Sequence, residues 1–307
     1  MRSKTKIVFI HEGKSWFLPY ALHQAKSSNP EAEIVLLGEK VPYAQVTSTG
    51  FEILQGTQLE IDFRKSYVHL NTNPESFELI CFVRWFYLLQ YMELNKVDEV
   101  FCFDSDVLLY SSVAELFDVY DLKNADCGFL IFGQEDHYTS ASAGTSFWTR
   151  EALKKFCDYM VQCYGQESYL KKLKDLWERY RDGGGNGGIC DMTVLYMFWQ
   201  ENHVRTVNLF LDRNRNIFDQ NINLGVDYGA GEFEIFEGQK KVLFVNGKPN
   251  LFRLSPTKEQ VMSHLLHFQG QAKGDMPVYY TGCYFKGKMA ADLKAFAYRM
   301  RRSFNRK

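Results

Sequence analysis

Two carboxylates that stand one residue apart follow a strongly apolar segment in the first half of the chain. Residues 99–103 (EVFCF) predict a buried strand, and Asp104, Ser105 and Asp106 come directly after it. Ligands of open α/β sheets bind beyond the carboxyl ends of the strands, so this triplet stands where a ligand would bind. Two neighbouring acids repel each other, and a divalent cation relieves the repulsion. The motif predicts a cation that could hold a diphosphate, and the open alternative is a solvated turn or a helix cap.

A second polar motif stands late in the chain and combines His267, Gly270 and Lys273 in the segment HFQGQAK. An imidazole can complete a metal shell, a glycine permits close approach of the backbone, and a lysine can bind a phosphate. The alternative interpretation is a structural histidine with satisfied hydrogen bonds. On its own the motif does not decide between these two interpretations.

Buried strands and helices must position these motifs. Apolar runs over 6–10 and 33–37 predict parallel strands, and residues 18–26 between them have helical character. A strand–helix–strand unit at the start of the chain indicates a doubly wound α/β fold. The glycine-rich run over 183–188 predicts a loop, with a lid hinge and a plain exposed loop as open alternatives.

A long helix is predicted to begin after Asn73 as N-cap, with Pro74 at its first position, and to end near Glu93. Its predicted core face consists of Phe77, Ile80, Val83, Tyr87 and Tyr91. The remaining predicted elements are helices from Ser112, from Thr149 to Tyr164, over 168–181 and over 192–200, strands over 127–132, 146–149 and 204–209, a hairpin over 233–244, and a tight turn at Asn246-Gly247.

The order of these elements indicates one domain over 1–286. Its first half, about 1–106, would bind a nucleotide and its second half, 107–286, an acceptor; residues 287–307 would form a basic amphipathic helix. On that helix Leu293, Phe296, Ala297, Met300 and Phe304 share one face, and Arg299, Arg301, Arg302, Arg306 and Lys307 surround it. Such a helix can dock on an anionic membrane surface, or it can pack on the domain as a solvated last helix.

Composition excludes several classes of protein. A formal net charge of -1 provides no excess basic charge for binding a nucleic acid. The seven cysteines form no C-x-x-C pair, which disfavours a zinc site and indicates buried free thiols in a reducing compartment. Neither a signal region nor a bilayer-spanning stretch is apparent. We therefore expect a cytoplasmic protein, with peripheral contact to the cytoplasmic membrane face as the variant that the last helix suggests.

The two polar motifs together resemble the nucleotide-diphospho-sugar transferases of the GT-A fold. Within them, the glycogenin and lipopolysaccharide galactosyltransferase group (glycosyltransferase family 8) combines an Asp-x-Asp with a late His-Phe-x-Gly-x-x-Lys. That group also carries an arginine on the helix before the Asp-x-Asp strand, and Arg84 stands at the matching place. The resemblance covers residues 77–275 in patches. It implies an α/β domain with a mixed central sheet and a metal-dependent glycosyltransferase.

The resemblance also implies roles for single residues. Asp104 would face the ribose and the metal, Asp106 and His267 would be direct metal ligands, Lys273 would bind the diphosphate, and Arg84 would contact the sugar or a phosphate. The metal of this group is usually manganese and its donors are mostly UDP-sugars. Carboxylates with one imidazole fit Mn²⁺ or Mg²⁺ without choosing between them.

Other donor contacts are altered or indirect. Ser142 replaces the asparagine of the family's Asn-x-Gly segment, which Gly144 completes, and Met192 replaces the glutamine of an Asp-Gln pair that begins at Asp191. Asp191 is open to two interpretations, a sugar-binding or nucleophilic residue and a helix cap. Asp219-Gln220 is a weaker rival for that pair. Backbone groups near Ile10 and His11 would hold the uracil and ribose, because a strand end in that position faces the cleft.

The implied reaction is attack of an acceptor hydroxyl on the anomeric carbon while metal and Lys273 stabilise the departing diphosphate. The resemblance favours retention of configuration, and we expect a glycan or lipid-linked acceptor. A rival class is the haloacid dehalogenase-like phosphatase, although Leu108 stands where that class has a small hydroxylated residue. A sugar-1-phosphate nucleotidyltransferase and a non-catalytic carbohydrate-binding protein are two further rival classes.

Overall fold

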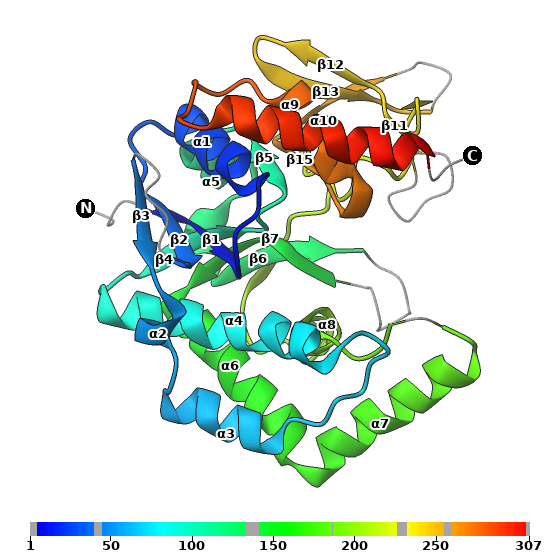
Figure 1. Cartoon of the computed structure of the whole chain (residues 1–307). Helices are drawn as coiled ribbons and strands as arrows, with labels where there is room; N and C mark the ends of the chain where they lie inside the picture. Colours follow the sequence, from blue (N-terminus) through cyan, green and yellow to red (C-terminus); the bar gives the residue numbers. More distant parts are fainter. Residues whose placement is uncertain are drawn as a thin grey trace. The chain divides into compact units, whose positions relative to one another are not determined.

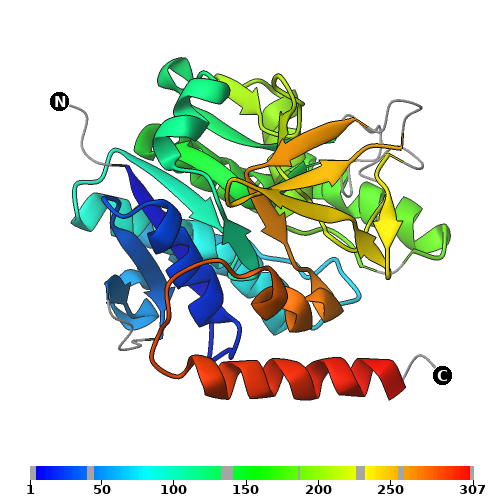
Figure 2. The ribbon, with the colours of Figure 1, turned by 90° about the horizontal axis from the view of Figure 1, so that it is seen from above.

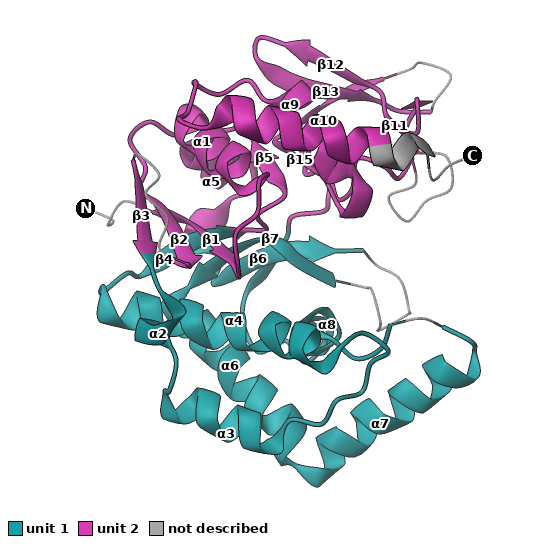
Figure 3. Cartoon of the chain, viewed as in Figure 1, with its two compact units in different colours: residues 1–3, 49–102, 124–208 teal, residues 4–48, 103–123, 209–307 magenta. Residues whose placement is uncertain are grey.

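The computed structural model describes residues 5–39, 45–132, 141–185, 187–225, 232–254 and 259–304 (Figure 1). The chain forms two compact units that alternate along the sequence (Figure 3). Unit 1 contains Thr49–Cys102 and Asn124–Asn208, and unit 2 contains the described parts of Lys4–Ser48, Phe103–Lys123 and Leu209–Lys307. The assignment of nucleotide-binding and acceptor-binding halves stays a prediction.

Seven strands form the main sheet in the order β3-β2-β1-β4-β7-β6-β8. Within unit 2, β1 and β2 are parallel, with Ile7 opposite Ile34. Within unit 1, β6 is antiparallel to β7 and parallel to β8. The predicted α/β fold with a mixed central sheet is therefore confirmed. The strands are β1 (Lys6–His11), β2 (Ile34–Gly38), β3 (Val46–Thr49), β4 (Glu99–Phe103), β6 (Cys127–Ile131), β7 (Ala141–Thr149) and β8 (Thr206–Asn208).

Unit 1 has an aromatic core. The ring centroids of Trp85 and Trp148 lie 5.8 Å apart, and Phe156 stacks on Trp148 at 5.4 Å. The side chain of Thr149 accepts a hydrogen bond from the backbone of Ala152, which confirms the predicted cap. The helices of this unit are α2 (Phe51–Leu54), α3 (Gln58–Ser66), α4 (Glu75–Leu94), α6 (Arg150–Gly165), α7 (Glu167–Asp182) and α8 (Asp191–Gln200).

Helix α4 differs from its prediction in two respects. Its N-cap is Pro74, and the Asn73 side chain instead donates a hydrogen bond to Glu78. Phe77 is 56% exposed although its spacing predicts the core face, whereas Phe82 is fully buried. The reason is that residues 82–89 are buried on nearly all sides of the helix, so the buried surface is not a single stripe.

The glycine-rich run after α7 is anchored at its far end. The backbone of Gly187 exchanges hydrogen bonds with Thr72, through the main chain at 2.8 Å and the hydroxyl at 2.7 Å, and Gly188 forms a bridge with Asn71. Asn186, within the run, lies outside the described residues. The lid hinge stays a prediction.

Unit 2 surrounds the acidic triplet with short strands. β5 pairs with β15 in an antiparallel ladder, with His267 opposite Val107. The predicted hairpin over 233–244 is in fact two hairpins: β10 pairs with β11, and β12 turns at Asn246-Gly247 into β13. Both turn residues have positive φ, 51° and 78°, as that tight turn requires. The strands are β5 (Val107–Leu109), β9 (Asn216–Ile217), β10 (Ile235–Phe236), β11 (Gln239–Lys240), β12 (Val242–Val245), β13 (Lys248–Phe252), β14 (Gln260–Ser263) and β15 (Leu265–His267).

The helices of unit 2 include the predicted capped helix α5, where Ser112 accepts a hydrogen bond from the backbone of Glu115. Figures 1 and 2 both show α10, in red, beside the orange segment that contains α9. The helices of unit 2 are α1 (Leu18–Ser28), α5 (Val113–Val119), η2 (Gly270–Asp275), α9 (Met276–Tyr279) and α10 (Lys288–Phe304). The short helix η1 (Leu122–Asn124) spans the point in the sequence where unit 2 gives way to unit 1.

All seven cysteines are free. Five are buried, whereas Cys81 is half-buried and Cys283 is exposed, so burial is confirmed for most of them. Among the described residues, the helices lack the combination of length and apolar character that crossing a bilayer would need. The compartment stays a prediction.

Candidate active site

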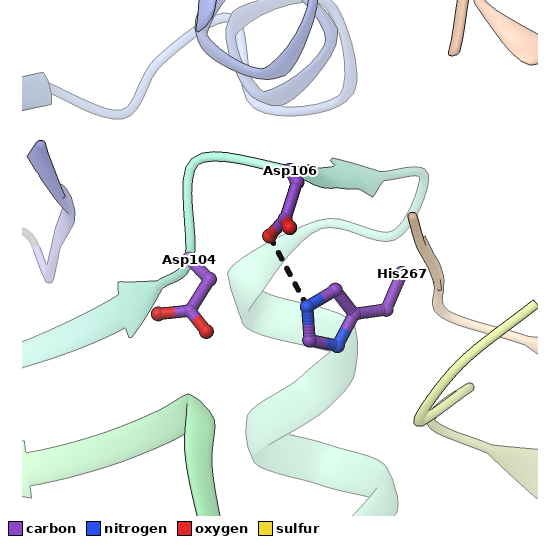
Figure 4. Close-up of side chains that lie close together, drawn as sticks. All are labelled: Asp104, Asp106 and His267. Carbon is purple, nitrogen blue, oxygen red and sulfur yellow. Dashed lines mark hydrogen bonds and ion pairs between the residues drawn. The ribbon is translucent and has the colours of Figure 1, made fainter. Parts of the chain in front are cut away.

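Strand pairing brings the two polar motifs together in unit 2. Asp104 and Asp106 lie in the turn that leads into β5, and His267 is the last residue of β15. Because β15 pairs with β5, the imidazole reaches the turn from a position far along the sequence. One ligand atom from each of the three residues lies within 4.8 Å of the other two. Figure 4 shows the three side chains converging on one space.

The cluster combines two acids with two basic groups. His267 Nε2 lies 3.1 Å from Asp106 Oδ1, and Lys273 Nζ lies 2.7 Å from Asp106 Oδ2. Burial alone would raise the pKa of Asp106, but His267 and Lys273 hold it well below its usual range. Burial alone would lower the pKa of His267, but the carboxylate of Asp106 raises it. The cluster is therefore set to keep Asp106 ionised.

The donor set fits a divalent cation. Two carboxylates and one imidazole are ligands of Mn²⁺ and Mg²⁺. Ligand atoms on opposite sides of such an ion lie roughly 4 Å apart, which is close to the 4.8 Å spread of Asp104, Asp106 and His267. The three residues could hold one cation after small side-chain movements.

A buried ion pair fixes the main chain of His267. Its backbone N–H donates to Asp219 Oδ2 at 3.0 Å, and Lys240 Nζ lies 2.6 Å from Asp219 Oδ1. The side chains of Asp219 and Lys240 are both 0% exposed. The sequence makes Asp219 the weaker candidate for a sugar-binding Asp-Gln pair, but its carboxylate is engaged with Lys240 and the backbone of His267. Sequence reasoning missed Lys240, because a lysine in a hairpin strand is usually exposed.

His11 and Ser105 join the end of β1 to the acidic triplet. Ser105 Oγ lies 2.8 Å from His11 Nδ1, and Ser15 Oγ lies 2.8 Å from His11 Nε2. Burial is the largest influence on the pKa of His11 and lowers it. A neutral imidazole held between two hydroxyls orders the segment after Ile10. This segment is the one predicted to hold the base and ribose.

Lys273 stands on η2, one turn after Gly270. Gly270 has a φ of +54°, in the left-handed region that favours glycine, with open space around its α-carbon. The ammonium of Lys273 lies 5.4 Å from the centre of the Phe17 ring. The side chain is partly exposed. It can therefore exchange Asp106 for an incoming phosphate oxygen.

Arg84 and Asp191 form a separate cluster in unit 1. Arg84 Nη2 lies 2.8 Å from Asp191 Oδ2, and the indole of Trp85 donates to the same oxygen at 2.9 Å. The interpretation of Asp191 as a helix cap is wrong. The N-cap of α8 is Cys190, because Asp191 is already the first helical residue and its carboxylate points to Arg84 and Trp85. A role in sugar binding stays a prediction.

Ser142 and Gly144 lie on β7 where its pairing with β6 is irregular. Leu130 pairs with Ser142, but the preceding Phe129 pairs with Ser146, so the residues between form a bulge. Gly144 donates its backbone N–H to Ser142 Oγ at 3.3 Å. Bulges redirect side chains and often adjoin functional sites. The predicted contact with the donor sugar stays a prediction.

Comparison with known proteins finds similarity only among solved structures: neither a protein-family model nor a curated protein matches the chain. Mouse xyloside xylosyltransferase 1 is 13% identical, with a TM-score of 0.48 over 70% of this chain and 87% of its own. An active-site mutant of LgtC is 14% identical, with a TM-score of 0.46 over 92% of this chain and 99% of its own. The glycosyltransferase GlyE of Streptococcus pneumoniae is 16% identical, with a TM-score of 0.42 over 96% of this chain and 60% of its own.

These proteins belong to the class that the sequence motifs resemble. LgtC is named a galactosyltransferase in a complex with donor and acceptor sugar analogues. Similarity at such identities and scores is a partial likeness in the path of the chain. One fold hosts many reactions, so the reaction of this chain has to be inferred from its side chains.

Proposed function

We propose that the chain is a metal-dependent glycosyltransferase that moves a sugar from a nucleotide-diphosphate donor to a glycan or glycolipid acceptor. A UDP-hexose is the donor that the sequence resemblance favours. The observation that supports this proposal most strongly is the convergence of Asp104, Asp106 and His267 next to Lys273. A cation site beside a partly exposed lysine suits a diphosphate leaving group.

The residues of this cluster have distinct tasks in the proposal. Asp104, Asp106 and His267 would hold Mn²⁺ or Mg²⁺, which when bound neutralises charge on the diphosphate. Lys273 would turn from Asp106 to a phosphate oxygen. Backbone groups at Ile10 and His11 would bind the base and ribose. Arg84 would contact the donor sugar or a phosphate, and Ser142, Gly144 and Asp191 would contact the donor sugar. Asp191 is also the candidate for a nucleophile.

The proposed transfer needs no reactant besides the sugar donor and the acceptor. The acceptor hydroxyl oxygen bonds to the anomeric carbon, and the bond from that carbon to the diphosphate oxygen breaks. The electron pair stays on the diphosphate, and the hydroxyl proton passes to a diphosphate oxygen or to solvent. Retention of configuration follows from the resemblance to the galactosyltransferase group.

Leu108 disfavours the hypothesis that the chain is a haloacid dehalogenase-like phosphatase. That class needs a small hydroxylated residue at this position, whereas Leu108 is fully buried in β5 and pairs with Leu266. A carbohydrate-binding protein would leave the cation cluster unexplained, since sugar binding alone needs no diphosphate apparatus.

Nucleotide binding tests the proposal. Calorimetric titration with UDP, GDP, CDP and ADP, in Mn²⁺ and in chelator, would compare the natural chain with Asp106→Ala and with Asp118→Ala. Asp118 is a matched control because its exposed carboxylate pairs only with exposed Lys123 among the ion pairs of the described residues.

We expect one nucleotide to bind in Mn²⁺, to be lost with chelator or Asp106→Ala, and to be kept in Asp118→Ala. Failure of every nucleotide with Mn²⁺ and with Mg²⁺ would contradict the proposal. Hydrolysis of small phosphoesters would then favour the phosphatase, and sugar binding without a nucleotide would favour the carbohydrate-binding protein.

A further inference from the structure

The last helix turns its large apolar side chains outward. Along α10 these side chains recur at helical spacing on one face, while small residues occupy the opposite face, where Ala291 is 7% and Ala295 is 0% exposed. The helix thus packs on the domain, as one of the two alternatives from the sequence expects, but it does so through its small residues. The outward residues are Met289 (72% exposed), Leu293 (70%), Phe296 (57%) and Met300 (43%). The side chains of residues 301–307, Phe304 among them, lie outside the described residues.

Specific contacts hold the opposite face of α10 against the rest of unit 2. Asp292 accepts a hydrogen bond from the hydroxyl of Tyr20 and pairs with Lys288. Tyr298 packs against Trp16 with ring centroids 6.0 Å apart. These contacts fix which face points outward. The exposed apolar stripe is thus a feature of a docked helix.

Positive charge is concentrated on the same segment. Residues 286–307 contain eight Lys and Arg and one Asp, whereas the whole chain contains 36 Lys and Arg and 37 Asp and Glu. The rest of the chain is therefore net negative by eight charges. Lys286 and Lys294 are exposed, and the single acid, Asp292, is already paired. An apolar face bordered by basic residues complements a bilayer with anionic headgroups.

The docked helix also adjoins the candidate active site. A β-carbon added at Gly274 would lie 3.0 Å from side-chain atoms of Arg299 and Tyr298, so α10 lies directly against η2. The residue before Gly274 is Lys273, which pairs with Asp106. Helix α10 thus packs against the short segment that carries Lys273.

We propose that α10 docks on an anionic membrane surface and so brings the site to an acceptor that is anchored in lipid. The second part rests on the proposed glycosyltransferase function, and the docking itself does not. A second copy of the chain is a less favourable occupant, because two such helices would oppose their positive charges across the apolar seam.

Vesicle flotation with the full chain tests the docking. Vesicles of phosphatidylcholine alone would be compared with vesicles that contain equal parts of phosphatidylglycerol. The variant Leu293→Glu/Phe296→Glu reverses the character of the stripe, and Phe236→Glu is its control, since Phe236 is 65% exposed on β10. Far-UV circular dichroism and UDP titration in Mn²⁺ would accompany each sample.

We expect binding to the anionic vesicles that falls at least roughly tenfold in the double variant and at raised salt, with Phe236→Glu unaffected. Equal flotation of the natural chain and the double variant would overturn the docking, as would no flotation of either. A dimer in light scattering that only the double variant abolishes would assign the stripe to self-association and also overturn it.

The two proposals fail separately. Loss of vesicle binding with intact UDP binding in the double variant supports the docking without involving the site. Vesicle binding by a natural chain that binds no nucleotide would leave the docking in place and contradict the glycosyltransferase. Transfer to a lipid-linked acceptor that is equally fast with neutral and anionic vesicles would overturn the link between them.

Discussion

Two carboxylate–lysine pairs lie on either side of His267, and they differ in their access to solvent. Lys273 pairs with Asp106 at 2.7 Å with side chains 26% and 11% exposed, whereas Lys240 pairs with Asp219 at 2.6 Å with both side chains 0% exposed. The ring of His267 contacts the first pair and its backbone N–H contacts the second. The two pairs thus have the same charges at nearly the same distance, but one is partly exposed to solvent and the other is fully buried.

The difference indicates two tasks for one kind of pair. An accessible lysine can leave its partner, because water or a ligand then solvates both charges. An enclosed lysine has no such substitute, so its partner would remain buried and uncompensated. We infer that the first pair exchanges with ligands, whereas the second pair keeps the backbone of His267 in place.

The largest expected effect is on folding stability in Lys240→Met. Removing one partner of a buried pair typically costs about 3–5 kcal/mol, and here it strands the carboxylate of Asp219. Urea denaturation should show this loss, while Lys273→Met, the matched control, should lose about 1 kcal/mol or less. Equal losses in the two variants would remove the distinction between the pairs.

The double variant Asp219→Leu/Lys240→Met sharpens that result. Replacing both charges removes the stranded carboxylate but leaves the backbone N–H of His267 without its acceptor. We expect a stability between those of the natural chain and Lys240→Met. A double variant less stable than Lys240→Met would show that the carboxylate itself, rather than the pairing, is what the fold needs.

A similar contrast separates His264 from His267. Burial is the largest influence on the pKa of His264 and contributes to lowering it to about 4; Glu115 raises it and Lys248 lowers it by smaller amounts. Within the described residues its Nε2 makes no hydrogen bond, so a second ring proton would have no acceptor there. His267, beside Asp106, has a raised pKa.

The expected consequence is a loss of stability in acid that depends on His264. Above pH 6.5 the residue is neutral in both states and costs nothing; as the pH falls towards 4 the unfolded chain binds a proton that the folded chain refuses. The loss should reach about 3 kcal/mol. Denaturation at pH 7 and at pH 5 should show a smaller difference in His264→Gln than in the natural chain.

The smallest effect on the fold, with a clear effect on binding, is expected for Lys273→Met. Loss of a charged contact to a phosphate should weaken metal-dependent nucleotide binding by about 1.5–3 kcal/mol, roughly tenfold to a hundredfold. Calorimetry in Mn²⁺ measures this, with Lys294→Met as a control on an exposed lysine of α10. Unchanged affinity would remove Lys273 from the diphosphate site.

Local signals made part of this predictable from the sequence. The strand over 99–103 agrees with β4 at both ends, because an apolar run closed by charged residues marks its own limits. The caps at Ser112 and Thr149 were predictable because a cap is formed within a few residues. The grouping of Asp104, Asp106 and His267 could be expected only through the resemblance, since the pairing of β5 with β15 is not local.

The features that the sequence left open or missed all depend on contacts outside the local segment. The carboxylate of Asp191 turns from a cap towards Arg84, which is more than a hundred residues away in the chain. Phe77 fits the helical period, but it lies in the first turn of α4, which is mostly exposed, whereas the middle of the helix is buried. The stripe on α10 would suit an inward face equally well by its sequence, and only the contacts of Asp292 and Tyr298 show that it points outward.

The separation of Asp106 and His267 by 161 residues has a consequence for biosynthesis. Contacts between distant segments form late, because closing a long loop costs entropy before any contact compensates for it. A chain still emerging from the ribosome would complete its cation ligands only after residue 267 had been made. Under the proposed function, affinity for a cation would thus appear only together with the finished fold.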